Sequence, residues 1–226
     1  MLCVKCNSKM ELNTIDGVEI DVCPQCGGIF LDDGEFQNLT GIDPGTGLVR
    51  LSRFVEVLSK FHDRAILDEL TEVYTRKYYS DFIKNVFANK NRGVLTLIYV
   101  DIDYFKRVND KHGHKSGDIV LKEVAKRLKS SLRVSRDEYI FRIGGEEFVI
   151  VLFNINREDS YNAAETLRKI IETDPIILPD GSKITINISV GVALSRQTDT
   201  PDTLYKRADN LLYKAKEAGR NRVTIE

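Results

Sequence analysis

The sequence predicts an α/β sandwich with a mostly antiparallel central sheet, preceded by a small metal-binding unit. After Asp68, strand-like and helix-like segments alternate, as in a sheet covered by helices. One connection, at Gly144–Gly145, joins two strands directly, so that part of the sheet must be antiparallel. All four cysteines of the 226-residue chain lie near the N-terminus in two C-x-x-C pairs. The length fits one domain of about 160 residues with a small appendage.

Apolar periodicity and turn residues place the elements that follow Asp68. Leu95–Val100 is apolar on both alternating faces, as in a strand covered on both sides. Pro179–Gly181 is expected to form the turn of a hairpin between short strands. The expected order is a helix (77–91), a strand (94–101), two helices (104–111 and 117–132), a hairpin (139–153), a helix (158–173), a short strand near Ile176, a longer strand (183–194), a helix (203–218) and a last strand (222–225).

The run RIGGEEFVIVL, from Arg142 to Leu152, carries the first functional indication. Gly144 and Gly145 can adopt a positive φ at a hairpin tip, and without a Cβ they let a ligand lie against the backbone. Glu146 and Glu147 follow at the edge of a buried sheet. Carboxylates at such a place are candidates for holding a divalent cation and for transferring a proton.

The second indication lies upstream, where the strand at Leu95–Val100 runs into polar residues. These are Asp101, Asp103, Lys106, Asn109, His114 and Asp118. A capped loop is one interpretation, because Asp118 opens an amphipathic helix and could be only an N-cap or first-turn acid. The combination with the glycine run favours a functional site.

Four motifs in order resemble the GGDEF-domain family of diguanylate cyclases. The glycine run reads GGEEF at Gly144–Phe148, and DIDYFKRVNDKHGHKSGD (101–118) and ADNLLYKAKEAGRNRV (208–223) also match. DELTEVYTR (68–76) is similar to the family's opening motif, with Glu72 in place of the usual Gly and Thr75 in place of Asn. The resemblance implies the palm-like fold of nucleotide cyclases and a reaction in which two GTP molecules, one on each of two domains, form cyclic di-GMP and pyrophosphate.

The resemblance also implies a role for each matching residue. Asp101, the Ile102 carbonyl and Glu146 would hold Mg²⁺ or Mn²⁺, and Glu146 and Glu147 would be catalytic. The substrate-binding residues would be Asn109 and Asp118 at the guanine edge, Gly145 in the glycine loop, and Phe105, Lys106, Lys216 and Arg220 at the phosphates. For Lys216 and Arg220, one helical turn apart, a structural interpretation is that both complement a helix C-terminus.

The chemistry favours these residue types independently. Phosphoryl transfer depends mostly on positioning and charge neutralisation, and hard carboxylate oxygens suit Mg²⁺.

The chain departs from the family at R-x-x-D, a product-inhibition site upstream of the glycine run, where it has Ser135 and Glu138. Serine offers no guanidinium fork to a phosphate or a guanine. We therefore expect a cyclase without allosteric product inhibition at this site.

The cysteine pairs Cys3–Cys6 and Cys23–Cys26 have the spacing of a structural zinc site with four thiolates. Residues 1–40 resemble a zinc ribbon of the transcription-factor-IIB type. Two disulfides are the alternative, but they need an oxidising compartment. The sequence shows neither a signal peptide nor an apolar segment of membrane length, so we expect a cytoplasmic protein without a membrane partner.

Charge argues against a nucleic-acid partner for the ribbon. Residues 1–45 contain two lysines and eight carboxylates, a net charge of −6, and a phosphate backbone would be repelled. A protein partner or a signal is the better expectation.

Residues 41–67 would be a linker and connecting helix, and 68–226 the cyclase domain. From Leu48 to Ala65 the apolar residues fit a heptad, which favours either packing on the same domain or a short coiled coil that pairs two chains in a homodimer.

A competing interpretation is a module that binds GTP for regulation without catalysis. Such domains usually lose a signature carboxylate, whereas Asp101, Glu146 and Glu147 are present here. A zinc-ribbon scaffold with an inactive cyclase domain remains open, because turnover also requires the right dimer.

Overall fold

The computed structural model describes residues 2–4, 7–15, 18–24, 29–30, 34–35, 38, 66–89, 92–132 and 138–226. The chain divides into two compact units, 1–66 and 67–226. In the first unit, β1 (Glu11–Ile15), β2 (Val18–Val22) and β3 (Ile29–Phe30) form an antiparallel sheet. Ile20 is fully buried at its centre. The heptad segment from Leu48 to Ala65 lies outside the described residues.

The second unit alternates strands and helices, as the sequence predicts. Its elements are β4 (Tyr74–Thr75), α3 (Arg76–Ala88), β5 (Leu95–Ile102), α4 (Phe105–His112), α5 (His114–Ser131), β6 (Glu138–Arg142), β7 (Glu147–Phe153), α6 (Arg157–Thr173), β8 (Ile176–Ile177), β9 (Lys183–Ile184), β10 (Ile188–Leu194), α7 (Pro201–Glu217) and β11 (Val223–Ile225).

A six-stranded sheet with the order β11-β10-β5-β7-β6-β4 forms the centre of this unit. The four inner strands are antiparallel to one another, while each edge strand runs parallel to the strand beside it. The predicted mostly antiparallel sheet and the hairpin of β6 and β7 are confirmed. The turn predicted at Pro179–Gly181 also forms, between β8 and β9, with Gly181 at φ +80°.

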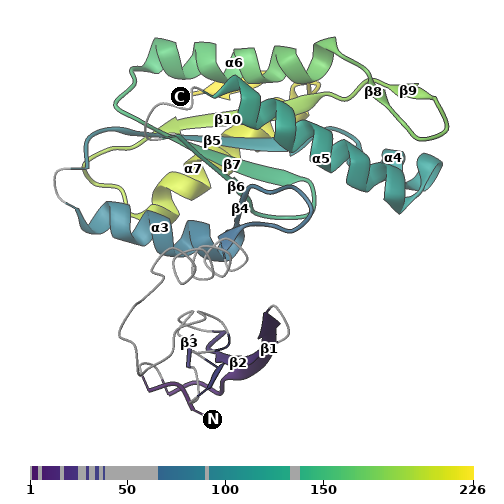
Figure 1. Cartoon of the computed structure of the whole chain (residues 1–226). Helices are drawn as coiled ribbons and strands as arrows, with labels where there is room; N and C mark the ends of the chain where they lie inside the picture. The colour runs from purple at the N-terminus through teal and green to yellow at the C-terminus, as the bar shows by residue number, and fades with distance from the viewer. Residues whose placement is uncertain are drawn as a thin grey trace. The chain divides into compact units, whose positions relative to one another are not determined.

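Helices cover both faces of the sheet, as Figure 1 shows. Alternate residues of β5 divide between the two faces, because successive side chains of a strand point in opposite directions. Ile98, Val100 and Ile102 pack with α5 and α6, whereas Leu97 and Tyr99 pack with α3 and α7. The continuous apolar sequence of β5 therefore supplies two cores. The same alternation directs Asp101 to the face that carries α7.

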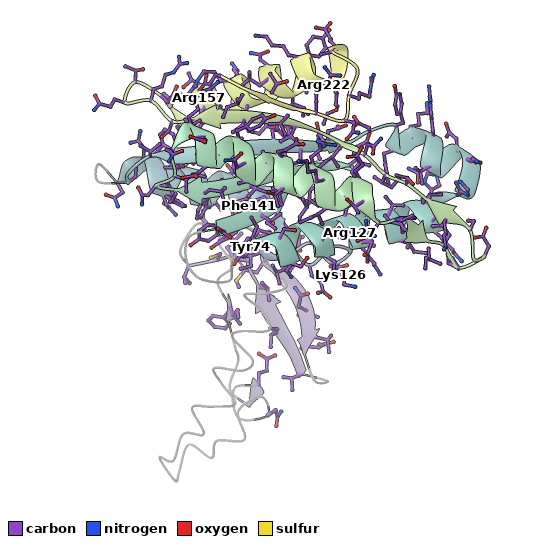
Figure 2. The ribbon with its side chains drawn as sticks, turned by 90° about the horizontal axis from the view of Figure 1, so that it is seen from above. Tyr74, Lys126, Arg127, Phe141, Arg157 and Arg222 are labelled. Atoms are coloured by element: carbon purple, nitrogen blue, oxygen red, sulfur yellow. The ribbon has the colours of Figure 1, made fainter. Side chains whose placement is uncertain are left out.

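Aromatic rings fill the part of the second core next to β4. Tyr74 of β4 and Phe141 of β6, both labelled in Figure 2, have ring centroids 5.5 Å apart. Phe82 of α3 lies 5.3 Å from the same Phe141 ring. These contacts hold the two-residue strand β4 against the sheet. They thereby fix the turn at Asp68, which precedes β4, beside the end of β6.

Two expected boundaries are wrong. α5 begins at His114, not at residue 117, and its N-cap is Gly113, at φ +79° and without a side-chain cap. Asp118 consequently lies in the second turn and does not cap the helix. The strand expected over 183–194 is divided between β9, which pairs with β8, and β10, which pairs with β5. The strand is interrupted between Ile184 and Ile188. In this interval the Asn187 carbonyl accepts a hydrogen bond from the backbone amide of Asp103.

The two departures in the opening motif have clear structural consequences. Glu72, where the family usually has glycine, adopts φ +54°, a left-handed conformation that costs a residue with a Cβ about 1–2 kcal/mol. Thr75, where the family usually has asparagine, is the N-cap of α3, and its side chain accepts a hydrogen bond from the Tyr78 amide. Serine, threonine, asparagine and aspartate all cap helices well, so the second change keeps the local structure.

Candidate active site

The glycine loop between β6 and β7 is tied to the opening turn of the domain. The Arg142 guanidinium donates to Asp68 Oδ1 at 2.9 Å and to the Gly145 carbonyl at 2.8 Å. Burial would raise the pKa of Asp68, but hydrogen bonds from Thr71 and Arg142 outweigh it and hold the pKa below its usual range. Asp68 is therefore charged at neutral pH. One arginine thus connects two motifs that lie 74 residues apart.

The expected positive φ at Gly144 and Gly145 is wrong, since the described glycines with positive φ are elsewhere. A Cβ on Gly144 would lie 2.4 Å from Oε2 of Glu147, so this glycine makes room for that carboxylate. A Cβ on Gly145 would meet no described atom within 4 Å. The backbone at Gly145 is accordingly open to a ligand. Gly144 instead leaves the space that the Glu147 carboxylate occupies.

Three carboxylates lie near the point where β5 ends and β7 begins, but among the described residues no three acids form a group that could hold a metal ion by themselves. Asp101 lies directly opposite Glu147 in the antiparallel register. The amide of Ile102 donates to the carbonyl of Glu146 at 3.3 Å. Paired residues of neighbouring strands share a face, so the side chains of Asp101 and Glu147 project to the same side of the sheet.

A lysine from the far end of the chain neutralises Asp101. Lys216, in the last turn of α7, places Nζ 2.7 Å from Oδ2 of Asp101. Burial raises the pKa of Asp101 to about 6 against the opposing effect of Lys216, and Glu146 and Glu147 raise it further. This carboxylate is buried among other acids and requires a positive charge nearby. Lys216 supplies that charge.

Asp103 holds the turn that follows α7. Its Oδ1 accepts from Ser189 at 2.7 Å and its Oδ2 from the amide of Asn221 at 2.9 Å. Nε of Arg220 lies 4.0 Å from Oδ1. Arg220 and Asn221 both have a positive φ, and such strained residues persist only where surrounding contacts fix them. Arg220 is therefore not on the helix with Lys216, as the sequence suggested, but its side chain reaches the same Asp-x-Asp segment.

The N-terminus of α4 lies beside this turn. Its N-cap, Tyr104, has φ +58° and provides no side-chain cap, while its carbonyl accepts a hydrogen bond from the Arg107 amide at 2.8 Å. Arg107 and Arg220 lie over the Tyr104 ring, at 4.3 and 4.6 Å from its centroid. Phe105 is buried, whereas the side chain of Lys106 is exposed. Helix amides and nearby cations together suit an anionic ligand.

Asn109 and Asp118 lie near each other across the α4–α5 junction. A Cβ on Gly117 would be 2.0 Å from Oδ1 of Asn109 and 3.2 Å from the Phe105 ring. The glycine thus lets the Asn109 amide pack against the start of α5. Asp118, the next residue, is exposed. Asn109 thus packs against the residue that precedes Asp118.

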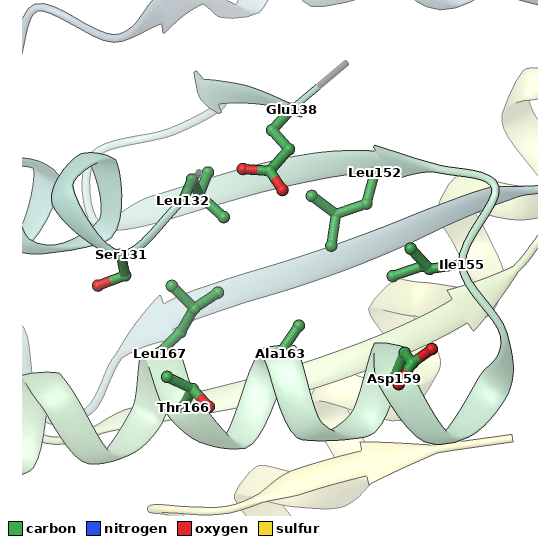
Figure 3. A pocket seen from close by; sticks show the side chains of 9 residues that line it. All are labelled: Ser131, Leu132, Glu138, Leu152, Ile155, Asp159, Ala163, Thr166 and Leu167. Carbon is green, nitrogen blue, oxygen red and sulfur yellow. The ribbon is translucent and has the colours of Figure 1, made fainter. Parts of the chain in front are cut away.

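A separate cavity of about 450 Å³ lies between the ends of α5 and β7 and the helix α6 (Figure 3). Its described lining carries the carboxylates of Glu138 and Asp159 and includes neither lysine nor arginine. Glu138 is the last position of the sequence segment compared with R-x-x-D. Ser135, the first position, lies outside the described residues.

The first cysteine of each C-x-x-C pair is buried in one cluster. Cys3 and Cys23 lie there with Met10. The amide of Cys3 donates to the Ser8 carbonyl, and that of Asn7 donates to the Cys3 carbonyl. Cys6 and Cys26 lie outside the described residues. The fold of the first unit thus brings Cys3 and Cys23 together.

Sequence reasoning assigned no role to four residues that position the site: Asp68, Asp103, Arg142 and Tyr104. Asp103 was visible as the second acid of Asp-x-Asp, and Asp68 and Arg142 stand within recognised motifs. Their partners could not be foreseen, because Asp103 and Asn221 are 118 residues apart.

Comparison with known proteins identifies the family. Residues 65–222 match the family described as "Diguanylate cyclase, GGDEF domain", and residues 2–40 match a transcription-factor zinc-finger family of the TFIIB zinc-ribbon type. The chain is 39% identical over 171 residues to the uncharacterised protein YhcK of Bacillus subtilis, covering 74% of this chain and 47% of that protein. It is 39% identical over 160 residues to diguanylate cyclase DgcS of Shewanella oneidensis, covering 70% of this chain and 52% of that protein. The chain thus spans about half the length of these relatives.

Solved structures share the fold of the second unit. The GGDEF domain of DgcB from Caulobacter crescentus, in complex with c-di-GMP, is similar with a TM-score of 0.68 and 28% identity, covering 71% of this chain and 95% of that chain. The active GGEEF domain of a diguanylate cyclase from Vibrio cholerae has a TM-score of 0.60 and 37% identity, covering 68% and 96%. Among the described residues of this chain, no helix has the length and apolar character needed to cross a membrane.

Proposed function

Because the chain belongs to the GGDEF-domain family of diguanylate cyclases, we propose that it condenses two GTP molecules into cyclic di-GMP and two pyrophosphates. The convergence of Asp101, Glu146 and Glu147 beside Lys216 and Arg220 carries this proposal. Phosphoryl transfer requires acidic side chains that bind a divalent cation and positively charged side chains that bind phosphate. Incubating the purified chain with GTP and Mg²⁺ and separating the products by chromatography tests it.

The residues at the end of β5 fit a divalent cation. Asp101 is buried and paired with the Lys216 ammonium group, and the Glu146 carbonyl accepts a hydrogen bond from the Ile102 amide. We propose that Asp101, the Ile102 carbonyl and Glu146 hold Mg²⁺ or Mn²⁺ through oxygen ligands. The bound ion would neutralise phosphate charge and acidify the attacking hydroxyl.

The cations around the Asp-x-Asp segment are proposed to bind the triphosphate. Lys106, Lys216 and Arg220 supply positive charge, and the Phe105 amide at the start of α4 supplies an N–H donor. Lys216 would exchange the Asp101 carboxylate for a phosphate when nucleotide and cation enter. Gly145 leaves its backbone accessible to the substrate. Glu146 would help remove the proton from the attacking 3′-hydroxyl, and Glu147 would act beside it.

Asn109 and Asp118 are proposed to read the guanine edge. The N1–H and N2–H₂ groups of guanine are donors, which the Asp118 carboxylate can accept. Adenine presents an acceptor at N1, and two facing acceptors leave buried groups unpaired at a cost of about 1–3 kcal/mol each.

We expect mixtures of ATP and GTP to yield chiefly the di-guanylate product. Asp118→Asn should weaken GTP binding by about ten- to hundredfold, because it removes a charge-assisted hydrogen bond. Binding can be measured by calorimetry with a non-hydrolysable GTP analogue. Asp110→Asn makes the same change at an exposed acid on α4 and should bind normally. A mixed dinucleotide as the main product would contradict the role of Asp118.

The cavity beside Glu138 supports the proposal that product does not inhibit the enzyme at this position. Its described lining consists of two carboxylates, two hydroxyl side chains and apolar residues, and carboxylates repel the two phosphates of cyclic di-GMP. The resemblance to R-x-x-D is lost at both ends of the segment, at Ser135 and Glu138.

Two chains must meet for turnover, because each domain is proposed to hold one GTP. We propose that residues 48–65 pair the chains as a short coiled coil. A solved structure of the coiled coil and GGDEF domain of DgcB from Caulobacter crescentus is similar over 78% of this chain, with a TM-score of 0.72 and 27% identity. Pairing would raise the local concentration of the second active site to the order of millimolar.

Residues 1–40 are proposed to form a zinc ribbon that binds a protein partner or a signal, followed by a linker and helix at 41–67 and the cyclase domain at 68–226. The match to the zinc-finger family and the burial of Cys3 and Cys23 in one cluster support this proposal. A unit of this size is too small to be stable through its core alone, so the metal would be structural.

We expect about one Zn²⁺ per chain, held by Cys3, Cys6, Cys23 and Cys26. Elemental analysis of freshly purified protein measures this ratio directly. Cys3→Ser and Cys23→Ser should each lower it strongly, because they remove a ligand. Less than about a tenth of an equivalent, in protein produced with ample zinc, would contradict the site.

A further inference from the structure

Two tyrosine hydroxyls are hydrogen-bonded in series with the Glu147 carboxylate, on the face of the sheet that carries α7. Tyr99 of β5 is 3% exposed, and its Oη lies 3.2 Å from Oε1 of Glu147. On its other side the same Oη is 2.6 Å from Oη of Tyr205, a residue of α7. Tyr99 precedes Asp101 by two residues, so the strand directs both side chains to this face.

The direction of these hydrogen bonds follows from the groups present. An ionised carboxylate can only accept, whereas each tyrosine has one hydrogen to donate. The Tyr99 hydrogen therefore points to Glu147, and Tyr205 donates its own hydrogen to the Tyr99 oxygen. Burial raises the pKa of Tyr99, so the hydroxyl keeps the hydrogen it donates. The hydrogen of each tyrosine hydroxyl thereby has an acceptor.

The Glu147 carboxylate is held from two directions. Oε1 receives the hydrogen bond from Tyr99. Oε2 occupies the space that a Cβ of Gly144 would fill, 2.4 Å from that position. A glutamate has three rotatable bonds, and an exposed one samples several rotamers. Here one oxygen is anchored from inside the protein and the other lies against the glycine loop.

We propose that Tyr99 is a positioning residue for the reaction: its hydroxyl, held in turn by Tyr205, fixes the carboxylate of Glu147 at the edge of the active site. This inference rests on the proposed cyclase function. Tyr99 itself touches neither nucleotide nor cation and acts only through Glu147. Tyr205 acts one step further away, through Tyr99.

A third tyrosine provides a matched control. Tyr79 of α3 is 8% exposed and belongs to the same apolar cluster as Tyr99. Its ring centroid lies 6.0 Å from that of Tyr205. Its hydroxyl is buried and has no hydrogen-bond partner among the described residues. Tyr79→Phe therefore removes a buried hydroxyl from the same core and leaves the hydrogen bonds from Tyr205 to Tyr99 and from Tyr99 to Glu147 in place.

We expect Tyr99→Phe to lower kcat for cyclic di-GMP formation by about tenfold, the scale of one hydrogen bond to a charged group. The KM for GTP should stay within about twofold, because Glu147 is not proposed to bind the nucleotide. Tyr205→Phe should lower kcat by about threefold. The double variant should be no worse than Tyr99→Phe alone, since Tyr205 acts through Tyr99. Tyr79→Phe should keep the wild-type kcat.

Three results would overturn the proposal: a wild-type kcat for Tyr99→Phe, an equal loss for Tyr79→Phe, or losses at Tyr99 and Tyr205 that multiply. If the wild-type chain makes no cyclic di-GMP, the cyclase proposal fails, and crystal structures then decide the positioning claim. We expect one Glu147 orientation in the wild type and several in Tyr99→Phe. The same single orientation in both would refute the role of Tyr99.

Discussion

Replacing Glu146 with glutamine is expected to lower the rate of cyclic di-GMP formation by about two to four orders of magnitude. The amide keeps the shape of the side chain but removes a negative charge and a base. Glu146 adjoins Ile102 at the end of β5, and its charge acts on the buried Asp101. Both the cation site and the proton acceptor are therefore proposed to depend on this one carboxylate.

A steady-state assay of product formation measures this effect. Glu158→Gln makes the same change at an exposed acid on α6 and should keep the wild-type rate. Melting temperatures of both variants show whether the fold is retained. A Glu146→Gln variant that produces cyclic di-GMP at the wild-type rate would remove Glu146 from the catalytic residues.

Gly191→Ala is expected to lower the free energy of unfolding by about 3 kcal/mol. A Cβ at this position in β10 would lie 2.2 Å from the carbonyl oxygen of Ala208 and 2.3 Å from the amide of Leu212, both in the backbone of α7. Backbone atoms cannot rotate away as a side chain does. The helix must shift from the sheet, and Lys216, one turn further along α7, would lose its position at Asp101.

Thermal unfolding measures the cost, which corresponds to a fall of about 10 °C in melting temperature for a domain of this size. Gly181→Ala is the control, since Gly181 has φ +80° but a Cβ there meets no described atom within 4 Å. That variant carries only backbone strain, of about 1–2 kcal/mol. A melting temperature of Gly191→Ala within about 2 °C of the wild type would show that α7 adapts without cost.

The sequence predicted the strands and helices that are determined by residues close together in the sequence. The buried strand β5 and the hairpin of β6 and β7 follow from apolar runs and from the glycines between them. The start of α5 was misplaced, because its cap is a glycine at φ +79° that gives no side-chain signal. The strand over 183–194 was predicted as one element because pattern alone does not reveal that β9 and β10 pair with different partners.

The candidate site was predicted as a set of residues, whereas its internal support was not. Motifs indicated Asp101, Glu146 and Lys216, but the ion pair between Asp101 and Lys216 joins opposite ends of the domain. The hydrogen bond between the Tyr99 and Tyr205 hydroxyls likewise links residues 106 positions apart. Tyr99 and Tyr205 read as ordinary apolar positions of a strand and a helix. Only the packing of α7 on the sheet brings their hydroxyls together.

The most direct test of the account is the product formed from GTP by the purified full chain with Mg²⁺, separated by chromatography. The account predicts cyclic di-GMP with two equivalents of pyrophosphate, and an activity per chain that rises with protein concentration until the chains are paired. GTP that is bound but recovered unchanged at every protein concentration would contradict it and indicate a regulatory GTP-binding module instead.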